Sequence, residues 1–196
     1  MNLSTEKLEE IKKTVKKILN SARYKHTLSV LKMAILLAEK YNVNVKKTII
    51  ASLLHDFGKD ISYKKALELL RKSRINVDNE TKEIPALLHC LIGEIYARKN
   101  FKIKDKDILY AIKFHSTASE NMSKLAKIIY IADLAEVNRK FKGVDIIRRT
   151  AFKNLNKAMI LGLQSKISYL LKRKLPIHSD SIKAWNAVIQ TIGIRH

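Results

Sequence analysis

This chain of 196 residues is poor in the residues that crosslink a fold or make tight turns, with one cysteine, five glycines and two prolines. Disulfide bonds within the chain are excluded, because Cys90 has no partner. Glycine and proline together make up 7 of 196 residues, against an average share of about 12%. Because β-sandwiches and small barrels need these residues at their turns, the composition favours a helical domain.

Long apolar runs are also missing. The longest uncharged stretch is Ala184–Ile194, which is far shorter than the ~20 residues that span a bilayer. The N-terminal segment is charged from residue 6 and contains no apolar signal core. The single thiol is typical of a reducing compartment. We therefore predict a cytoplasmic protein with no membrane partner.

Acidic residues are scarce relative to basic ones. The chain has 39 Lys and Arg against 18 Asp and Glu, which gives a formal net charge of +21. Such a charge attracts polyanions, including nucleic acid, nucleotides and polyphosphates. A solvated basic surface explains the same surplus, so the charge alone selects no partner. The hydrophobic share of 46% indicates a folded chain, and its length predicts one domain over residues 1–196.

Apolar residues recur every three to four positions along most of the chain, which is the period of amphipathic helices. Ser4 or Thr5 is a suitable cap for the first helix, and Gly58 is a suitable C-terminal glycine for the third. The predicted fold class is all-α, a single bundle of about eight or nine helices. The segments run to about residue 19, then over 21–41, 45–55, 63–72, 85–99, 104–114, 122–136, 145–174 and 180–194, with a polar connector at 76–81.

Histidines and aspartates inside apolar segments carry the chemical signal. A buried carboxylate needs a partner, which a metal ion or a buried Arg or Lys would supply. Taken singly, each of these residues is more often a hydrogen-bonded core residue than a ligand. As a set, four imidazoles and two carboxylates suit divalent metals and are numerous enough for two ions. Cys90 is predicted to be a core residue, because neighbouring side chains diverge on a helix. The candidate ligands are His26, His55, Asp56, His89, His115 and Asp133.

The order of these residues, with Lys59 three positions after Asp56, resembles the HD-domain metal-dependent phosphohydrolases. Within them it is similar to the YqeK type, the bacterial symmetrical diadenosine tetraphosphate hydrolases. Two segments differ from the family pattern. Ser-Thr-Ala follows His115, where the family usually has a threonine directly and a glycine soon after. Residues 136–139 read Glu-Val-Asn-Arg, where the family usually has Glu-Pro-x-Arg. The resemblance covers nearly the whole chain and is carried by RYKHTLSV (23–30), LLHDFGK (53–59), IPALLHCLIGE (84–94), DILYAIKFHS (107–116) and MSKLAKIIYIADLAEVNRKFKGV (122–144).

The resemblance implies two metal sites that share Asp56. His89 and His115 would hold one ion, with Asp56 as the bridge to the other. Iron is the occupant that the family implies, with manganese or cobalt able to replace it. The implied reaction is symmetrical cleavage of diadenosine tetraphosphate to two ADP, by attack of a metal-bridging hydroxide on the polyphosphate. The ion on the other side would be held by His26, His55, Asp56 and Asp133.

Phosphoryl transfer also needs cations at the non-bridging oxygens of the attacked group. Lys59 and Arg139 are the candidates for this catalytic role beside Asp56, and Arg23 is a third candidate for binding phosphate. The alternative for each is an ordinary exposed basic side chain.

Two other functions are weighed against this one. The first is an HD-domain phosphohydrolase of another nucleotide, such as a nucleoside monophosphate, a dNTP or a cyclic nucleotide. The second is a non-catalytic basic module that binds nucleic acid. That module would leave the six candidate ligands as a coincidence, and its basic stretches lack the interleaved aromatics that stack bases. Nucleic acid is therefore not expected as a partner, whereas a monomer and a homodimer both stay open.

Overall fold

The computed structural model describes residues 5–75 and 77–191, and within these ranges the chain is helical and contains no strand. The all-α prediction is confirmed, but the described residues form eleven α-helices rather than eight or nine. The predicted cap at Ser4, position 76 of the polar connector and positions 192–194 of the last helix lie outside the described residues. The helices are α1 (Thr5–Ile18), α2 (Ser21–Lys40), α3 (Val45–Leu54), α4 (Tyr63–Lys72), α5 (Asn79–Glu83), α6 (Leu88–Lys99), α7 (Lys106–Phe114), α8 (Lys124–Ala135), α9 (Val144–Ala151), α10 (Leu155–Lys172) and α11 (Ser179–Thr191), with a 3₁₀ turn at Pro85–Leu87.

Two local features explain the additional helices. The predicted helix over 145–174 is broken, because Asn154 has an extended backbone (φ −154°, ψ 110°) that interrupts the helical path after α9. The Asn154 side chain then accepts a hydrogen bond from the amide of Lys157 and starts α10. The predicted polar connector contains α5, whose N-terminus is capped in the same way by Asp78.

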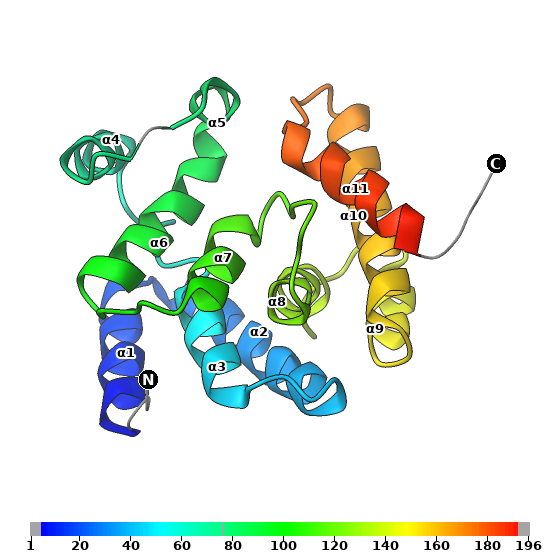
Figure 1. The fold of residues 1–196 in the computed structure, drawn as a ribbon, viewed down its shortest axis with the longest axis horizontal. Coiled ribbons are helices and arrows are strands. Elements are labelled where there is room, and N and C mark those ends of the chain that lie inside the picture. The colour runs from blue at the N-terminus through cyan, green and yellow to red at the C-terminus, as the bar shows by residue number, and fades with distance from the viewer. Residues whose placement is uncertain (1–4, 76, 192–196) are drawn as a thin grey trace.

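Helix α8 is the central element of the fold (Figure 1), with α2, α3 and α7 on one side and α9 and α10 on the other. Eight of its twelve residues are buried, as expected for a central helix that is mostly apolar. The main core gathers around it, and Trp185 of α11 packs against that core. A smaller apolar cluster joins α4 to α6 through Ala66, Leu70 and Leu88. None of the described helices is both long and apolar enough to cross a membrane.

Gly58 has a different role from the predicted one. Helix α3 ends at Leu54, with His55 as its C-cap in a right-handed conformation, and Gly58 lies in the turn beyond. Among the described glycines only Gly143 has a positive φ, so Gly58 is not a left-handed helix cap. A Cβ atom at Gly58 would lie 2.4 Å from the carbonyl oxygen of His89. Glycine is needed here because the turn after α3 packs directly on the backbone of α6.

Candidate metal centre

The six predicted ligands meet at one point, although they come from distant parts of the chain. Two of them stand at helix ends, where His55 follows α3 and His115 follows α7. Each of the six has a nitrogen or oxygen within 3.9 Å of such an atom of another member. The other four are His26 on α2, Asp56 in the turn after α3, His89 on α6 and Asp133 on α8.

One end of this cluster is formed around His26. Its Nε2 lies 2.9 Å from Asp133 Oδ1 and 3.9 Å from Asp56 Oδ2. The Nε2 of His55 lies 3.7 Å from the same Asp56 oxygen and 3.9 Å from Asp133 Oδ1. Two imidazoles and two carboxylates therefore face one another at this end.

The other end is formed by His89 and His115, whose Nε2 atoms are 3.1 Å apart. The second oxygen of Asp56, Oδ1, lies 3.4 Å from the Nε2 of His89 and 3.3 Å from the Nε2 of His115. Asp56 thus presents Oδ2 to one end and Oδ1 to the other. This is the arrangement needed for a carboxylate that bridges two ions.

Backbone hydrogen bonds orient three of the four imidazoles in the same way. The Nδ1 atoms of His55, His89 and His115 lie 2.7, 2.5 and 2.8 Å from carbonyl oxygens three residues earlier. Since a carbonyl only accepts, Nδ1 carries a proton, and Nε2 is the nitrogen that faces the cluster. A neutral imidazole held by its other nitrogen is the usual form of a histidine that ligates a metal.

The buried polar atoms of the cluster fit a bound cation. His55 Nε2 and Asp56 Oδ1 are both buried without a hydrogen bond, which is costly for His55, while the charge of Asp56 Oδ1 is met by Lys59 at 3.1 Å. The two bare Nε2 atoms of His89 and His115 would also repel each other at 3.1 Å unless a proton or a metal ion lay between them. Nitrogen and oxygen donors of this kind suit divalent transition metals and do not by themselves select one.

The electrostatics of the cluster also favour a cation. Burial acts to raise the pKa of Asp56, but interactions with His55, His115 and Lys59 outweigh burial and hold that pKa well below its usual range. Burial lowers the pKa of His55 to about 4, so this imidazole is neutral at pH 7. Burial acts in the same direction on His115, but Cys90 and Asp56 outweigh it and raise the pKa of His115 to about 10. Positive charge is therefore stabilised at the His89–His115 end.

The three predicted phosphate-binding residues occupy the edge of the cluster. Lys59 Nζ lies 3.1 Å from Asp56 Oδ1, and Arg139 Nη2 donates to Asp133 Oδ1 at 2.8 Å. Their side chains are 30% and 40% exposed, so both cations are open to solvent. The guanidinium of Arg23 instead pairs with Asp60, which is not one of the six candidate ligands. Its Nε donates to the Asp60 carboxylate at 2.6 Å. Arg23, Lys59 and His89 line one cavity of about 410 Å³, which we call the α4 cavity.

Sequence reasoning missed Glu136 as a part of this site. Glu136 is 2% exposed, and its Oε1 lies 3.2 Å from the Nδ1 of His26. The Glu136 carboxylate thus accepts from the Nδ1 of His26, as backbone carbonyls do from the Nδ1 atoms of the other three histidines. Arg148 supports it by donating to the carbonyls of Ala135 and Glu136 at 2.8 and 2.9 Å. Glu136 directly follows α8 and lies three residues after Asp133, and this proximity in the sequence is the signal that could have identified it.

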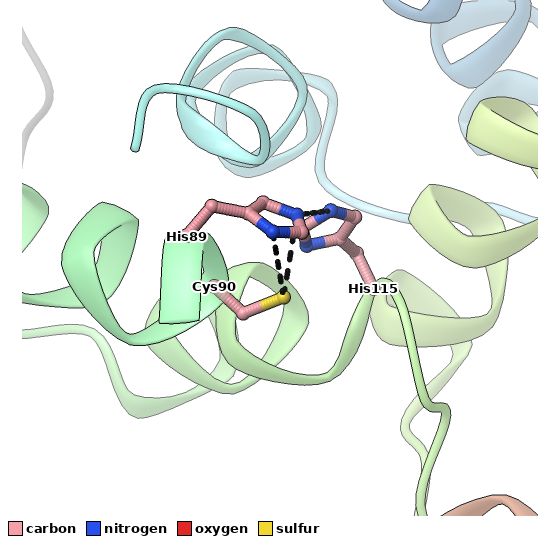
Figure 2. Close-up of side chains that lie close together, drawn as sticks. All are labelled: His89, Cys90 and His115. Carbon is pink, nitrogen blue, oxygen red and sulfur yellow. Dashed lines mark hydrogen bonds between the residues drawn. The ribbon is translucent and has the colours of Figure 1, made fainter. Parts of the chain in front are cut away.

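Cys90 lies closer to the site than its predicted core position implies. Its sulfur is buried and lies 3.4 Å from the Nε2 of His89, so the prediction that these neighbours diverge is wrong. Figure 2 shows His89, Cys90 and His115 grouped together. The cause is the His89 ring, which reaches back to the carbonyl of Ala86 and so places Nε2 beside the next residue.

The segments that differ from the family pattern are compatible with the convergence of the six candidate ligands. Val137, which stands where proline is usual, is 71% exposed and faces solvent. Ala118, after His115, has a φ of 60° in the left-handed region that favours glycine. Neither change displaces a residue of the cluster.

Comparison with known proteins defines the class. The model of the HD domain family matches residues 23–138, and this chain belongs to that family. It is 37% identical over 175 residues, or 89% of this chain and 93% of the relative, to a protein of Halalkalibacterium halodurans named symmetrical bis(5'-nucleosyl)-tetraphosphatase. A Bacillus subtilis protein of the same name is 32% identical and covers 92% of this chain and 97% of its own.

A solved structure shares the fold. The crystal structure of a Clostridium acetobutylicum protein, titled "predicted HD superfamily hydrolase involved in NAD metabolism", has a TM-score of 0.89 and 38% identity to this chain. The match covers 93% of this chain and 97% of that one. The helical arrangement around the candidate metal centre is therefore that of a known HD-domain protein.

Proposed function

We propose that this protein is a metal-dependent symmetrical bis(5'-nucleosyl)-tetraphosphatase that cleaves diadenosine tetraphosphate into two ADP. The observation that carries the proposal is the convergence of six imidazole and carboxylate side chains on one bridging aspartate, Asp56. The relatives named for this activity match about nine-tenths of the chain and of their own length, which supports the same substrate. We place the reaction in the cytoplasm, as the single thiol suggests.

The donors divide into two sets around Asp56. His89 and His115 would hold one ion together with Oδ1 of Asp56, and Oδ2 would reach the other ion. Divalent ions held in this way lower the pKa of bound water and so supply hydroxide at neutral pH. Iron is the occupant we propose, with manganese or cobalt able to replace it. The second set consists of His26, His55, Asp56 and Asp133.

The other residues of the site would act on the polyphosphate. Lys59 and Arg139 stand at opposite carboxylates, next to Asp56 and Asp133, with their ends open to solvent. In these positions each can bind a non-bridging oxygen as negative charge grows there. Arg23, held by Asp60, would bind a phosphate of the substrate that lies further from the candidate metal centre. The net charge of +21 draws polyanionic substrates toward the surface.

Product analysis tests this function. Metal-loaded protein is incubated with diadenosine tetraphosphate, and the nucleotides are separated by ion exchange. We expect two ADP per substrate, because attack in the middle of the bridge leaves two phosphates on each adenosine. AMP plus ATP would contradict symmetrical cleavage. Turnover of a nucleoside monophosphate, a dNTP or a cyclic nucleotide without turnover of diadenosine tetraphosphate would establish the alternative HD-domain phosphohydrolase.

A further inference from the structure

The α4 cavity leads from the candidate metal centre to an exposed aromatic ring. It is lined by His89 and Lys59, which lie 3.4 and 3.1 Å from the candidate ligand Asp56. Tyr63, the first residue of α4, also lines it. With a volume of about 410 Å³, the cavity is within the range of small-molecule sites. It is therefore large enough for part of a nucleotide.

The residues of the turn after α3 follow one another along the chain in the order of the groups in an ADP unit. The turn carries Asp56 first, then Lys59, then Asp60, which holds the guanidinium of Arg23 at 2.6 Å. Lys59 thus lies next to the metal centre and Arg23 lines the same cavity, so that these two cations can receive phosphates. Tyr63 follows at the end of the turn, where a base would lie.

Tyr63 is exposed and is not one of the residues that pack α4 onto the rest of the protein. Its side chain is 54% exposed, whereas Ala66 and Leu70 are the residues that pack α4 onto α6. A large exposed aromatic ring that lines the same cavity as two cations is suited to stacking on a base, because every base has a π-face. Packing of the helix does not explain why a tyrosine stands at this position.

We propose that Tyr63 is the stacking platform for one adenine of the substrate, and that the α4 cavity binds one ADP half of diadenosine tetraphosphate. This inference rests on the proposed function. Lys59 and Arg23 bind the two phosphates of that half, and the bond between the second and third phosphates lies at the metal centre. Tyr63 acts on affinity and specificity for the base and does not touch the reacting atoms.

Binding of ADP and of pyrophosphate to the metal-loaded full chain separates the base from the phosphates. Both ligands carry two phosphates, and only ADP carries adenine. Isothermal titration calorimetry on Tyr63→Ala is expected to show ADP binding about 5- to 150-fold weaker, which is the effect of losing one stacked base. Pyrophosphate binding is expected to be unchanged. Tyr63→Phe keeps the ring and should bind ADP as the unmodified protein does.

Tyr169→Ala is the matched control. Tyr169 is 56% exposed but lies on α10, where it lines a different cavity. Its removal should therefore change the affinity of neither ADP nor pyrophosphate. Equal weakening of ADP and pyrophosphate in Tyr63→Ala, or no weakening of either, would overturn the inference. The same variant should raise KM for diadenosine tetraphosphate and leave kcat and metal content unchanged. Cleavage to two ADP with ADP affinity insensitive to Tyr63 would reject this inference alone, whereas absence of that cleavage would reject the proposed function.

Discussion

Asp56→Ala is expected to abolish both metal binding and hydrolysis of diadenosine tetraphosphate. Asp56 places Oδ2 3.9 and 3.7 Å from the Nε2 atoms of His26 and His55. It places Oδ1 3.4 and 3.3 Å from those of His89 and His115. One substitution therefore removes a donor from both proposed ions and one of the two carboxylates proposed as ligands.

Elemental analysis after dialysis, combined with a turnover assay, measures this effect. Full metal content with unchanged activity in Asp56→Ala would contradict the ligand assignment. Glu9→Ala is the control, because Glu9 lies on the surface of α1 and pairs only with Lys12 among the ion pairs observed. This variant should keep its metal and its activity, which excludes a general effect of losing one carboxylate.

Lys59→Met and Arg139→Met are expected to lower kcat by about 100- to 1,000-fold each, the usual effect of removing one group that stabilises charge in a transition state. Methionine keeps an unbranched apolar side chain and removes the positive charge. Lys59 Nζ and Arg139 Nη2 lie 3.1 and 2.8 Å from the carboxylates of Asp56 and Asp133. The two cations therefore flank the centre at separate points, and neither replaces the other.

Steady-state kinetics on metal-loaded variants, with metal content measured in the same samples, tests these roles. The loss of rate should occur with the metal retained, which distinguishes it from the result expected for Asp56→Ala. Lys64→Met serves as the control, because Lys64 is an exposed lysine of α4. Unchanged kcat and KM in both Lys59→Met and Arg139→Met would show that their proposed phosphate roles are wrong.

The sequence predicted the members of the centre better than the contacts that shape it. Histidines and aspartates inside apolar segments stand out because a buried polar group needs a partner, and all six converge in the structure. Gly58 carried no such signal for its true role, since the close approach of the turn to His89 exists only after α6 has packed. The same holds for Cys90, whose distance to the Nε2 of His89 depends on the ring reaching back to Ala86.

Helix boundaries show the same division. Periodicity predicted the apolar faces, including that of the largely buried α8, because burial follows the repeat of the helix. The break between α9 and α10 depends on Asn154, whose extended backbone interrupts the helical path. Such a local change of backbone leaves the apolar period of the segment intact. The sequence did not identify Tyr63 either, because an exposed aromatic residue becomes a candidate for binding only when the structure shows a cavity beside it.

Anomalous diffraction from crystals grown with manganese tests the central claim of a two-ion centre most directly. We predict two peaks about 3.5–4 Å apart, both in contact with the carboxylate of Asp56. One should lie beside His26 and His55, and the other between His89 and His115. A single peak, no peak at this cluster, or two peaks that do not share Asp56 would contradict the account.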